Sequence, residues 1–295
     1  MGYDMAVEAS ALNEIFVEFY YWITVPLMFL IHVGFCLYEV SISRAKNQIH
    51  TLMKNAMLIP MVTVTMFLFG FWIYFAAQGP FGDFAGGSTG LPWDATMGSN
   101  LGDHIYGVFW AAFLLFSWTA ASIVSGAVIE RIRTGAFLIL AVLVGSVTWM
   151  IDAAWGWSAG GWMVTDWGYH DAYASGVIHG ICGGAALGIL AVLGPRIGKF
   201  APDGTPRDIP PSNPWFAVIG LFIIYTGFWG FYAACNLPIG QIDGIWTAST
   251  IYGTPTTLST ITFNFLMSLA GGLMAGYYMS KGCLLYTSPS PRDRG

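Results

Sequence analysis

The sequence is 295 residues long, with 56% hydrophobic, 16% aromatic and only 9% charged residues, whereas a water-soluble domain carries about a quarter charged residues. With a mean hydropathy of +0.62, this composition excludes an ordinary soluble domain and predicts several membrane spans rather than one anchor. The net charge of −5 says little about partners, because in a membrane protein the position of the charges matters more than their sum.

Seven apolar stretches reach or approach the length of about 20 residues that a helix needs to cross a bilayer. In chain order they cover residues 15–40, 56–77, 105–129, 135–154, 173–193, 214–235 and 258–280. The predicted fold is therefore all-α, a polytopic bundle of transmembrane helices.

The lysines and arginines follow a strict alternation between these stretches. All eleven lie after an odd-numbered stretch: Arg44, Lys46, Lys54, Arg131, Arg133, Arg196, Lys199, Arg207, Lys281, Arg292 and Arg294. The N-terminal segment and the loops after the second, fourth and sixth stretches carry acidic residues instead. By the positive-inside rule, we predict a multi-pass plasma-membrane protein with an extracellular N-terminus and a cytoplasmic C-terminus.

The fifth stretch contains one histidine, His179, and is preceded by a carboxylate, Asp171. An ionisable side chain inside a span is costly enough to suggest a function, and a neutral, hydrogen-bonded imidazole within the packing is the alternative. Asp171 stands near the predicted start of the helix, where a carboxylate can accept from free backbone N–H groups. We expect it to act mainly as a cap.

The same stretch repeats a glycine every four residues, at Gly176, Gly180, Gly184 and Gly188. Small residues at this spacing let two helix backbones approach closely. The pattern predicts that this helix is central and that His179 points into the bundle.

The acidic loops are rich in tryptophan, and an acidic, aromatic outer surface suits a cation. The alternative is an interfacial aromatic belt, which is common to membrane proteins. Of Trp155, Trp157, Trp162 and Trp167, we assign the last three to such a belt.

Chemistry that needs a metal or a bound cofactor finds no support in the sequence. The four cysteines, Cys36, Cys182, Cys235 and Cys283, stand singly, without the paired spacing of a zinc or haem site. No nucleophile or acid–base pair lies outside the spans. We therefore expect no cofactor, no metal, no enzymatic activity and no nucleic-acid partner.

Several ordered motifs resemble those of the ammonium transporters, in particular the plant-like branch of the group that includes methylammonium permeases and, more distantly, Rhesus proteins. They are RAKN at 44–47, GAVIER at 126–131, Trp155 before GGW at 160–162, SGVIH at 175–179, GPRIG at 194–198 and GFWGF at 227–231. The spacing of Asp171, His179 and Arg196 also matches.

The resemblance implies roles for individual residues. Trp155 and a phenylalanine gate, Phe116 and Phe231, would recruit the ammonium ion at an outer aromatic site, with Cys235 at the position of a serine that accepts a hydrogen bond from it. His179 would be the first of two pore histidines, past which neutral ammonia crosses. Asp171 would support the vestibule from behind.

Two further departures from the family pattern accompany Cys235. Ala174 occupies a glycine position, which puts the local packing in question, and Tyr232 replaces an asparagine. A thiol accepts hydrogen bonds much more weakly than a hydroxyl, so we expect an altered affinity or selectivity.

The resemblance further implies an eleven-span fold of two inverted repeats that assembles as a homotrimer. This chain supplies seven of those spans, and residues 283–295 resemble foreign coding sequence, so we interpret residues 1–282 as a truncated transporter domain. An ammonium sensor on the same scaffold, or a seven-span receptor, is the alternative function.

Overall fold

The computed structural model describes residues 5–80, 90–93, 105–242 and 245–281. The predicted tail at 283–295 lies outside the described residues. The helices are α1 (Met5–Ile42), α2 (Gln48–Thr65), α3 (Phe71–Ala76), α4 (Tyr106–Ala127), α5 (Thr134–Val142), α6 (Trp149–Gly156), α7 (Trp162–Trp167), α8 (Ile181–Leu193), α9 (Pro214–Ala234) and α10 (Leu258–Lys281), and the strands are β1 (Asn236–Ile242), β2 (Ile245–Thr250) and β3 (Pro255–Thr256).

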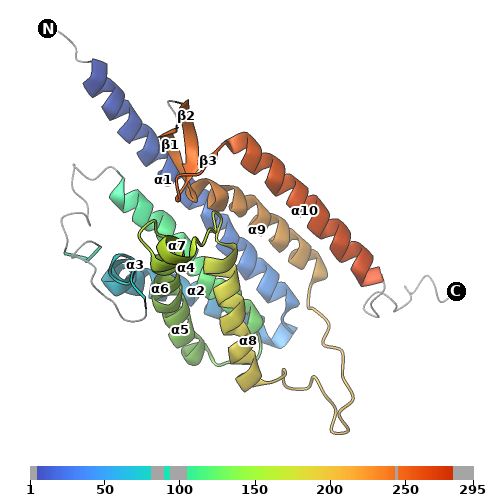
Figure 1. Ribbon diagram of the computed structural model, residues 1–295. Helices are drawn as coiled ribbons and strands as arrows, with labels where there is room; N and C mark the ends of the chain where they lie inside the picture. Colours follow the sequence, from blue (N-terminus) through green and yellow to red (C-terminus); the bar gives the residue numbers. More distant parts are fainter. Residues whose placement is uncertain (1–4, 81–89, 94–104, 243–244, 282–295) are drawn as a thin grey trace.

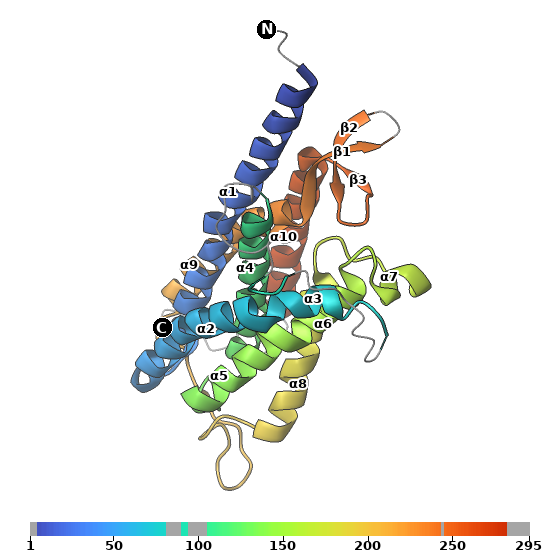
Figure 2. The same ribbon diagram turned by 90° about the vertical axis from the view of Figure 1, so that its left-hand side faces the viewer.

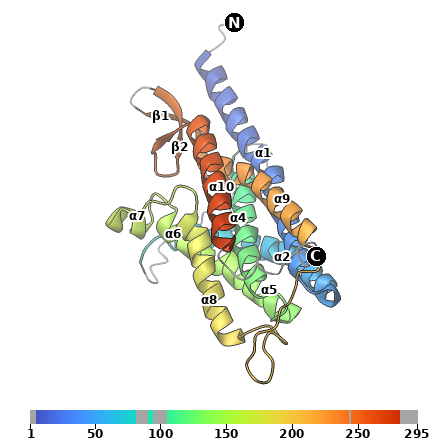
Figure 3. The same ribbon diagram turned by 90° about the vertical axis from the view of Figure 1, so that its right-hand side faces the viewer.

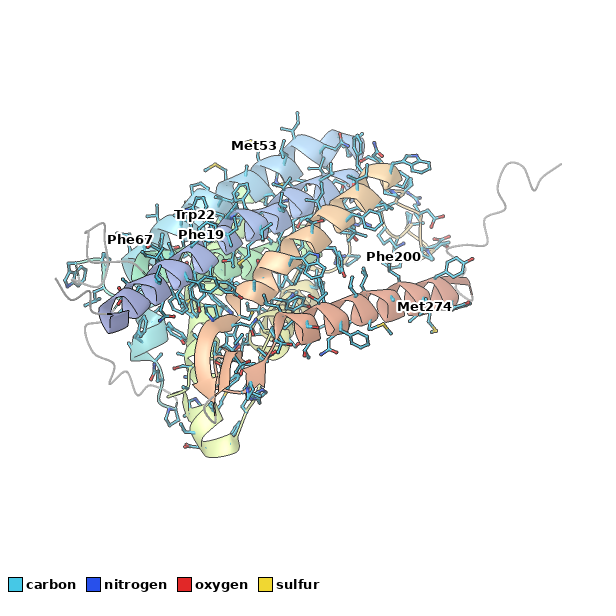
Figure 4. All side chains as sticks on the ribbon, turned by 90° about the horizontal axis from the view of Figure 1, so that it is seen from above. Phe19, Trp22, Met53, Phe67, Phe200 and Met274 are labelled. Carbon is cyan, nitrogen blue, oxygen red and sulfur yellow. The ribbon has the colours of Figure 1, made fainter. Side chains whose placement is uncertain are left out.

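Among the described residues, seven helical runs are long and apolar enough to cross a membrane, in the positions predicted from the sequence. Figure 4 shows large apolar side chains on their outer surfaces, including Phe19, Trp22, Met53, Phe67 and Met274. In water such exposure would be unfavourable. Facing lipid, the same side chains are in their preferred solvent.

Helices α1 and α9 lie side by side (Figure 1) and form the tightest helix pair of the bundle. A Cβ atom added at Gly34 would lie 2.6 Å from the backbone nitrogen of Ile224, and one added at Gly220 would lie 2.7 Å from that of Tyr38. Gly227 is equally close to α1. Only glycine permits this approach of the two backbones.

Within the described residues, the glycine ladder of the fifth span makes no close helix contact over most of its length. No described atom lies within 4 Å of the Cβ position at Gly184 or Gly188. Gly176 alone is crowded, because its Cβ would meet the Tyr169 hydroxyl. Spacing identified small residues correctly, but it could not say which of them face a neighbour.

The second, fourth and fifth spans each contain a π-helical turn, at Met66–Gly70, Leu143–Thr148 and Ser175–Gly180. The first two turns face each other. The Thr65 and Ser146 hydroxyls lie 2.8 Å apart, and a Cβ at Gly70 would lie 3.0 Å from the carbonyl oxygen of Ser146. The third turn carries His179, and π-helical turns are frequent at functional sites.

A small antiparallel sheet, in the order β1-β2-β3, was not predicted by the all-α assignment. It follows the sixth span and lies on the same side of the bundle as α7 (Figure 2). Tyr252, between β2 and β3, donates from its hydroxyl to the carbonyl oxygen of Gly156 at 2.5 Å. The residues 236–256 are threonine-rich and lack a helical period, but they are too mixed to predict a sheet.

Helix α10 lies on the outer side of α9 (Figure 3) and contacts it through the ring of Phe265. The ring of Phe265 lies 4.3 Å from that of Tyr225 and 4.7 Å from that of Tyr232. Phe265 thus links the seventh span to the end of α9 at which the sheet begins.

The loops after the first, third and fifth spans meet at one end of the bundle, as the charge alternation predicts. Arg44 Nε lies 2.8 Å from Glu130 Oε2, and Arg131 Nη1 donates to the carbonyl oxygen of Gly194 at 2.9 Å. The loops after the second and fourth spans meet at the other end, where Trp162 N donates to the carbonyl oxygen of Gln78.

Candidate functional site

Asp171 caps the start of the fifth span, as the sequence predicts. Its Oδ1 accepts from Ser175 N at 2.8 Å, and its Oδ2 accepts from Gly176 N at 2.7 Å and from Val177 N at 2.9 Å. The three N–H donors are free backbone groups of the first helical turn, which such a side chain satisfies. Asp171 is therefore occupied by the backbone of its own segment.

Ala174 adopts a left-handed conformation, with φ of 65° and ψ of 29°. This explains the glycine at the matching family position, because a residue with a Cβ atom is disfavoured there. The turn lets one carbonyl, that of Ala174, accept from the backbone N–H groups of both Ile178 and His179. The strained residue, Ala174, thus lies at the start of the turn that carries His179.

The imidazole of His179 is oriented by the same carbonyl. His179 Nδ1 lies 3.0 Å from the carbonyl oxygen of Ala174, and since a carbonyl only accepts, Nδ1 carries the proton. In the neutral ring Nε2 is then the acceptor. The backbone therefore selects a tautomer that leaves Nε2 able to accept a proton.

Phe116, Phe231 and His179 come together from three separate spans. The rings of Phe116 in α4 and Phe231 in α9 meet edge to face, with centroids 4.6 Å apart and an interplanar angle of 85°. The His179 ring lies 5.9 Å from that of Phe231 and 6.0 Å from that of Phe228. The two phenylalanines are fully buried.

Trp157, a residue assigned to an interfacial belt from the sequence, packs on Phe116. Its ring lies 5.1 Å from that of Phe116 at 88°, and it is 2% exposed. Trp155 instead packs on Trp162 at 5.6 Å. Trp167, 71% exposed, fits the belt, whereas the belt assignment of Trp157 and of the buried Trp162 is wrong.

Sequence reasoning missed Trp157 because the two tryptophans are only two residues apart at the end of α6. Trp157 lies just past the last helical residue, with φ of −125°. Its side chain therefore points in a different direction from the one it would have if the helix continued. No sequence signal fixes where a helix unwinds to within one residue.

Cys235 is fully buried one residue after α9. A buried thiol offers at most a weak hydrogen-bond acceptor near Phe231.

Four tyrosines surround the next residue, Asn236, and the sequence had singled out only one of them, Tyr232. Tyr173 and Tyr21 donate to Asn236, at 3.2 Å to its side-chain oxygen and at 3.0 Å to its carbonyl. The Tyr173 and Tyr232 rings meet at 5.4 Å, and Tyr20 donates to the nearby carbonyl of Ala233. Because they come from three spans, sequence spacing could not group them.

A cavity of about 360 Å³ opens beside these rings, between the end of α9, α10 and the sheet. Tyr173, Tyr232 and Phe265 form its aromatic side, and Thr250, Thr256 and Thr260 contribute hydroxyl groups. Aromatic faces and uncharged oxygens are suited to a small, partly dehydrated cation. Among the described residues, no group of His, Cys, Asp and Glu has the arrangement of a metal site.

The chain was compared with known protein families and known proteins. The Ammonium Transporter Family model matches residues 19–284. Ammonium transporter Amt2 of Archaeoglobus fulgidus is 35% identical over 232 residues, 73% of this chain and 46% of its own length. Ammonium transporter Amt2 of Haloferax mediterranei is 31% identical over 97% of this chain and 61% of its own length.

A solved structure described as a Sensor Amt Protein matches with a TM-score of 0.62 at 23% identity, over 75% of this chain and 55% of that one. The chain thus spans about half the length of the curated relatives it matches. The fold is that of a multi-pass membrane protein of this class, and its relatives are transporters rather than enzymes. The chain belongs to the ammonium transporter family.

Proposed function

We propose that the protein moves ammonium across the plasma membrane by recruiting the ion at an aromatic site and passing it on as ammonia and a proton. The observation that carries the proposal is the edge-to-face pair of Phe116 and Phe231 with His179 behind it. Family membership supports ammonium as the substrate.

The physical argument for deprotonation is energetic. An aromatic face attracts a cation by about 0.5–2 kcal/mol, whereas a charge at the centre of a bilayer costs at least about 2.5–3.5 kcal/mol. Recruitment by rings therefore cannot carry the ion through an apolar section. Splitting it into a proton and a neutral molecule removes this cost and rejects potassium, which has no proton to lose.

Each residue has a place in this scheme. Trp155 and the phenylalanine gate recruit the ion, with Cys235 as a weak acceptor beside them. His179 Nε2 is the free acceptor next to the gate, and Asp171 holds the turn that presents it. Trp157 joins the gate on the strength of its contact with Phe116.

The wider setting belongs to the same proposal. The acidic, tryptophan-rich end faces the exterior together with the N-terminus, and the basic end with the C-terminus faces the cytoplasm. Residues 1–282 form a truncated transporter domain, and the second histidine and the rest of the pore belong to the part of that domain outside this chain. The assembled protein is a homotrimer.

Uptake measurements test the proposal. Cells that lack their own ammonium transporters, and that express the protein from its gene, should take up labelled methylammonium and grow at low ammonium. His179→Ala should lose uptake or the selectivity over potassium, because no acceptor would follow the gate. His50→Ala, a histidine of α2 away from the gate, is the matched control.

Two outcomes would contradict the proposal. Wild-type rates and selectivity in His179→Ala would remove His179 from the pathway. Ammonium binding with membrane expression but without uptake in the wild type would identify a sensor on the same scaffold.

A further inference from the structure

A second cavity lies at the basic end of the bundle, far along the helices from Asp171. It has a volume of about 320 Å³ and is lined by the ends of α1 and α4 and by the loop between α8 and α9. Arg131 and Arg196 supply its charge, and Ile42, Ile129 and Ile209 supply apolar walls. It combines guanidinium groups and an aliphatic surface in one place.

The arginines around this cavity outnumber the carboxylates that pair with them. Glu130, whose side chain is 1% exposed, lies 2.8 Å from Arg44 Nε and 3.6 Å from Arg196 Nη1. Burial alone would raise the pKa of the Glu130 carboxyl, but hydrogen bonds from Asn47 and Arg44 and the Arg44 charge outweigh it and hold the pKa below its usual value. One negative charge is thus shared by two guanidinium groups.

The guanidinium of Arg131 adds a third positive charge that this carboxylate does not neutralise. Its Nη1 donates to the carbonyl oxygen of Gly194. Its Nε is enclosed and has no acceptor among the described residues. An anion in the cavity would supply the charge that is missing, because charge-assisted hydrogen bonds from guanidinium are the strong ones.

The position of the cavity indicates which kind of anion it would bind. The cavity sits where α1 and α4 end, at Ile42 and Ala127, which is the level of lipid headgroups. The loop that forms its rim exposes Ile197 and Phe200 next to Lys199 and Arg207. Exposed apolar residues beside basic ones are typical of segments that rest on an anionic membrane surface.

We propose that this cavity binds the phosphodiester headgroup of an anionic phospholipid in the adjacent leaflet. Arg131 and Arg196 bind the phosphate oxygens, and Ile42, Ile129 and Ile209 contact the start of the glycerol and acyl chains. A free phosphate would use the arginines but would leave the apolar walls unoccupied. The site does not depend on the transport proposal.

Lipid titration of the purified, lipid-stripped chain tests the site, with native mass spectrometry to count bound molecules. Phosphatidylglycerol should bind more tightly than phosphatidylcholine. The double variant Arg131→Gln/Arg196→Gln should weaken phosphatidylglycerol binding by about tenfold or more, the size expected from losing one hydrogen bond to a charged group, and should leave phosphatidylcholine unchanged.

The double variant Lys199→Gln/Arg207→Gln is the matched control, since it removes the same charge from the rim of the loop but not from the cavity. It should keep affinity within about twofold, as expected for exposed charges. Ile209→Trp should also lose binding, because it fills the cavity without changing charge or the ion pairs of Glu130. This variant distinguishes loss of the site from misfolding of the arginine variant.

Three results would overturn the proposal. An equal loss in both charge variants would mean a diffuse surface effect. Phosphatidylglycerol that binds no better than phosphatidylcholine would exclude a headgroup site. Binding of inorganic phosphate alone, with the same dependence on Arg131 and Arg196 and without an effect of Ile209→Trp, would assign the cavity to free phosphate.

Discussion

Asp171 and Glu39 are both buried carboxylates, but the protein satisfies one with its own backbone and the other with side chains from distant segments. Asp171 accepts from three backbone N–H groups within six residues of it. Glu39 in α1 accepts from the Asn55 amide at 2.8 Å and from the Ser125 hydroxyl, and its Oε2 lies 3.6 Å from Lys54 Nζ.

The hydrogen bonds of Asp171 depend on local structure, whereas those of Glu39 depend on tertiary structure. The cap of Asp171 forms wherever residues 171–177 turn into a helix, whereas the cluster around Glu39 exists only when α1, α2 and α4 are assembled. Lys54 is itself buried, donates to the carbonyl oxygen of Ser125 at 2.6 Å and lies over the Phe137 ring. Such a pair contributes little net stability but makes wrong assembly costly, because each charge needs its partner.

The largest predicted effect follows from removing one member of this pair. Lys54→Met should lower the free energy of unfolding by about 3–5 kcal/mol, since Glu39 would remain buried without a counter-ion. Unfolding in mixed micelles with a rising fraction of denaturing detergent measures the change. The double variant Glu39→Gln/Lys54→Met should recover part of the loss, because no charge is then left unpaired.

The exposed Lys46 gives the control for the Lys54 variant. Lys46→Met should stay within about 0.5 kcal/mol of the wild type. If Lys54→Met were as mild as Lys46→Met, the cluster around Glu39 would not be a buried ion pair, and the comparison with Asp171 would fail.

Replacing the locally held carboxylate should cost less. Asp171→Asn keeps one side-chain oxygen for three N–H donors and places an amide NH₂ against the others, so we expect a loss of about 1–3 kcal/mol. Asp166→Asn, at an exposed position, should be nearly neutral. Combined with Lys54→Met the effects should add, because the sites share no partner; strong coupling would mean that the cap is not local.

Features with a local physical cause could be predicted from the sequence. Span positions follow from apolar length, the meeting of the basic loops follows from charge alternation, and the cap follows from a carboxylate before a helix. Asp171 was identified in this way, whereas the glycine position at Ala174 came from the resemblance to the ammonium transporters. Each local feature needs only a few neighbouring residues to be decided.

Features that depend on packing between spans could not be predicted from the sequence. The glycines that do bring helices together, Gly34 and Gly220, stand in different spans, and their pairing is a tertiary fact. Trp157 could not be separated from Trp155, and the lysine within the second helix, Lys54, was counted as a loop charge although it is buried against Glu39. A charge pattern gives the side of the membrane but not burial.

The smallest predicted effect concerns strain in the turn that Asp171 caps. Ala174→Gly should change the free energy of unfolding by under about 1 kcal/mol, because the contributions nearly cancel. Relief of the left-handed conformation is worth about 1–2 kcal/mol, of which the greater freedom of glycine in the unfolded chain removes about 0.5–1 kcal/mol, and loss of a buried methyl group removes a further part.

The strain at Ala174 is measured by the difference between this variant and Ala172→Gly. Ala172 is not among the described residues with positive φ, so its replacement should destabilise by about 0.5–1 kcal/mol. Detergent unfolding of the two variants side by side measures the difference. An equal loss of stability in both would show that residues 171–177 hold no strain at Ala174, and that the turn presenting His179 is as relaxed as the helix that follows it.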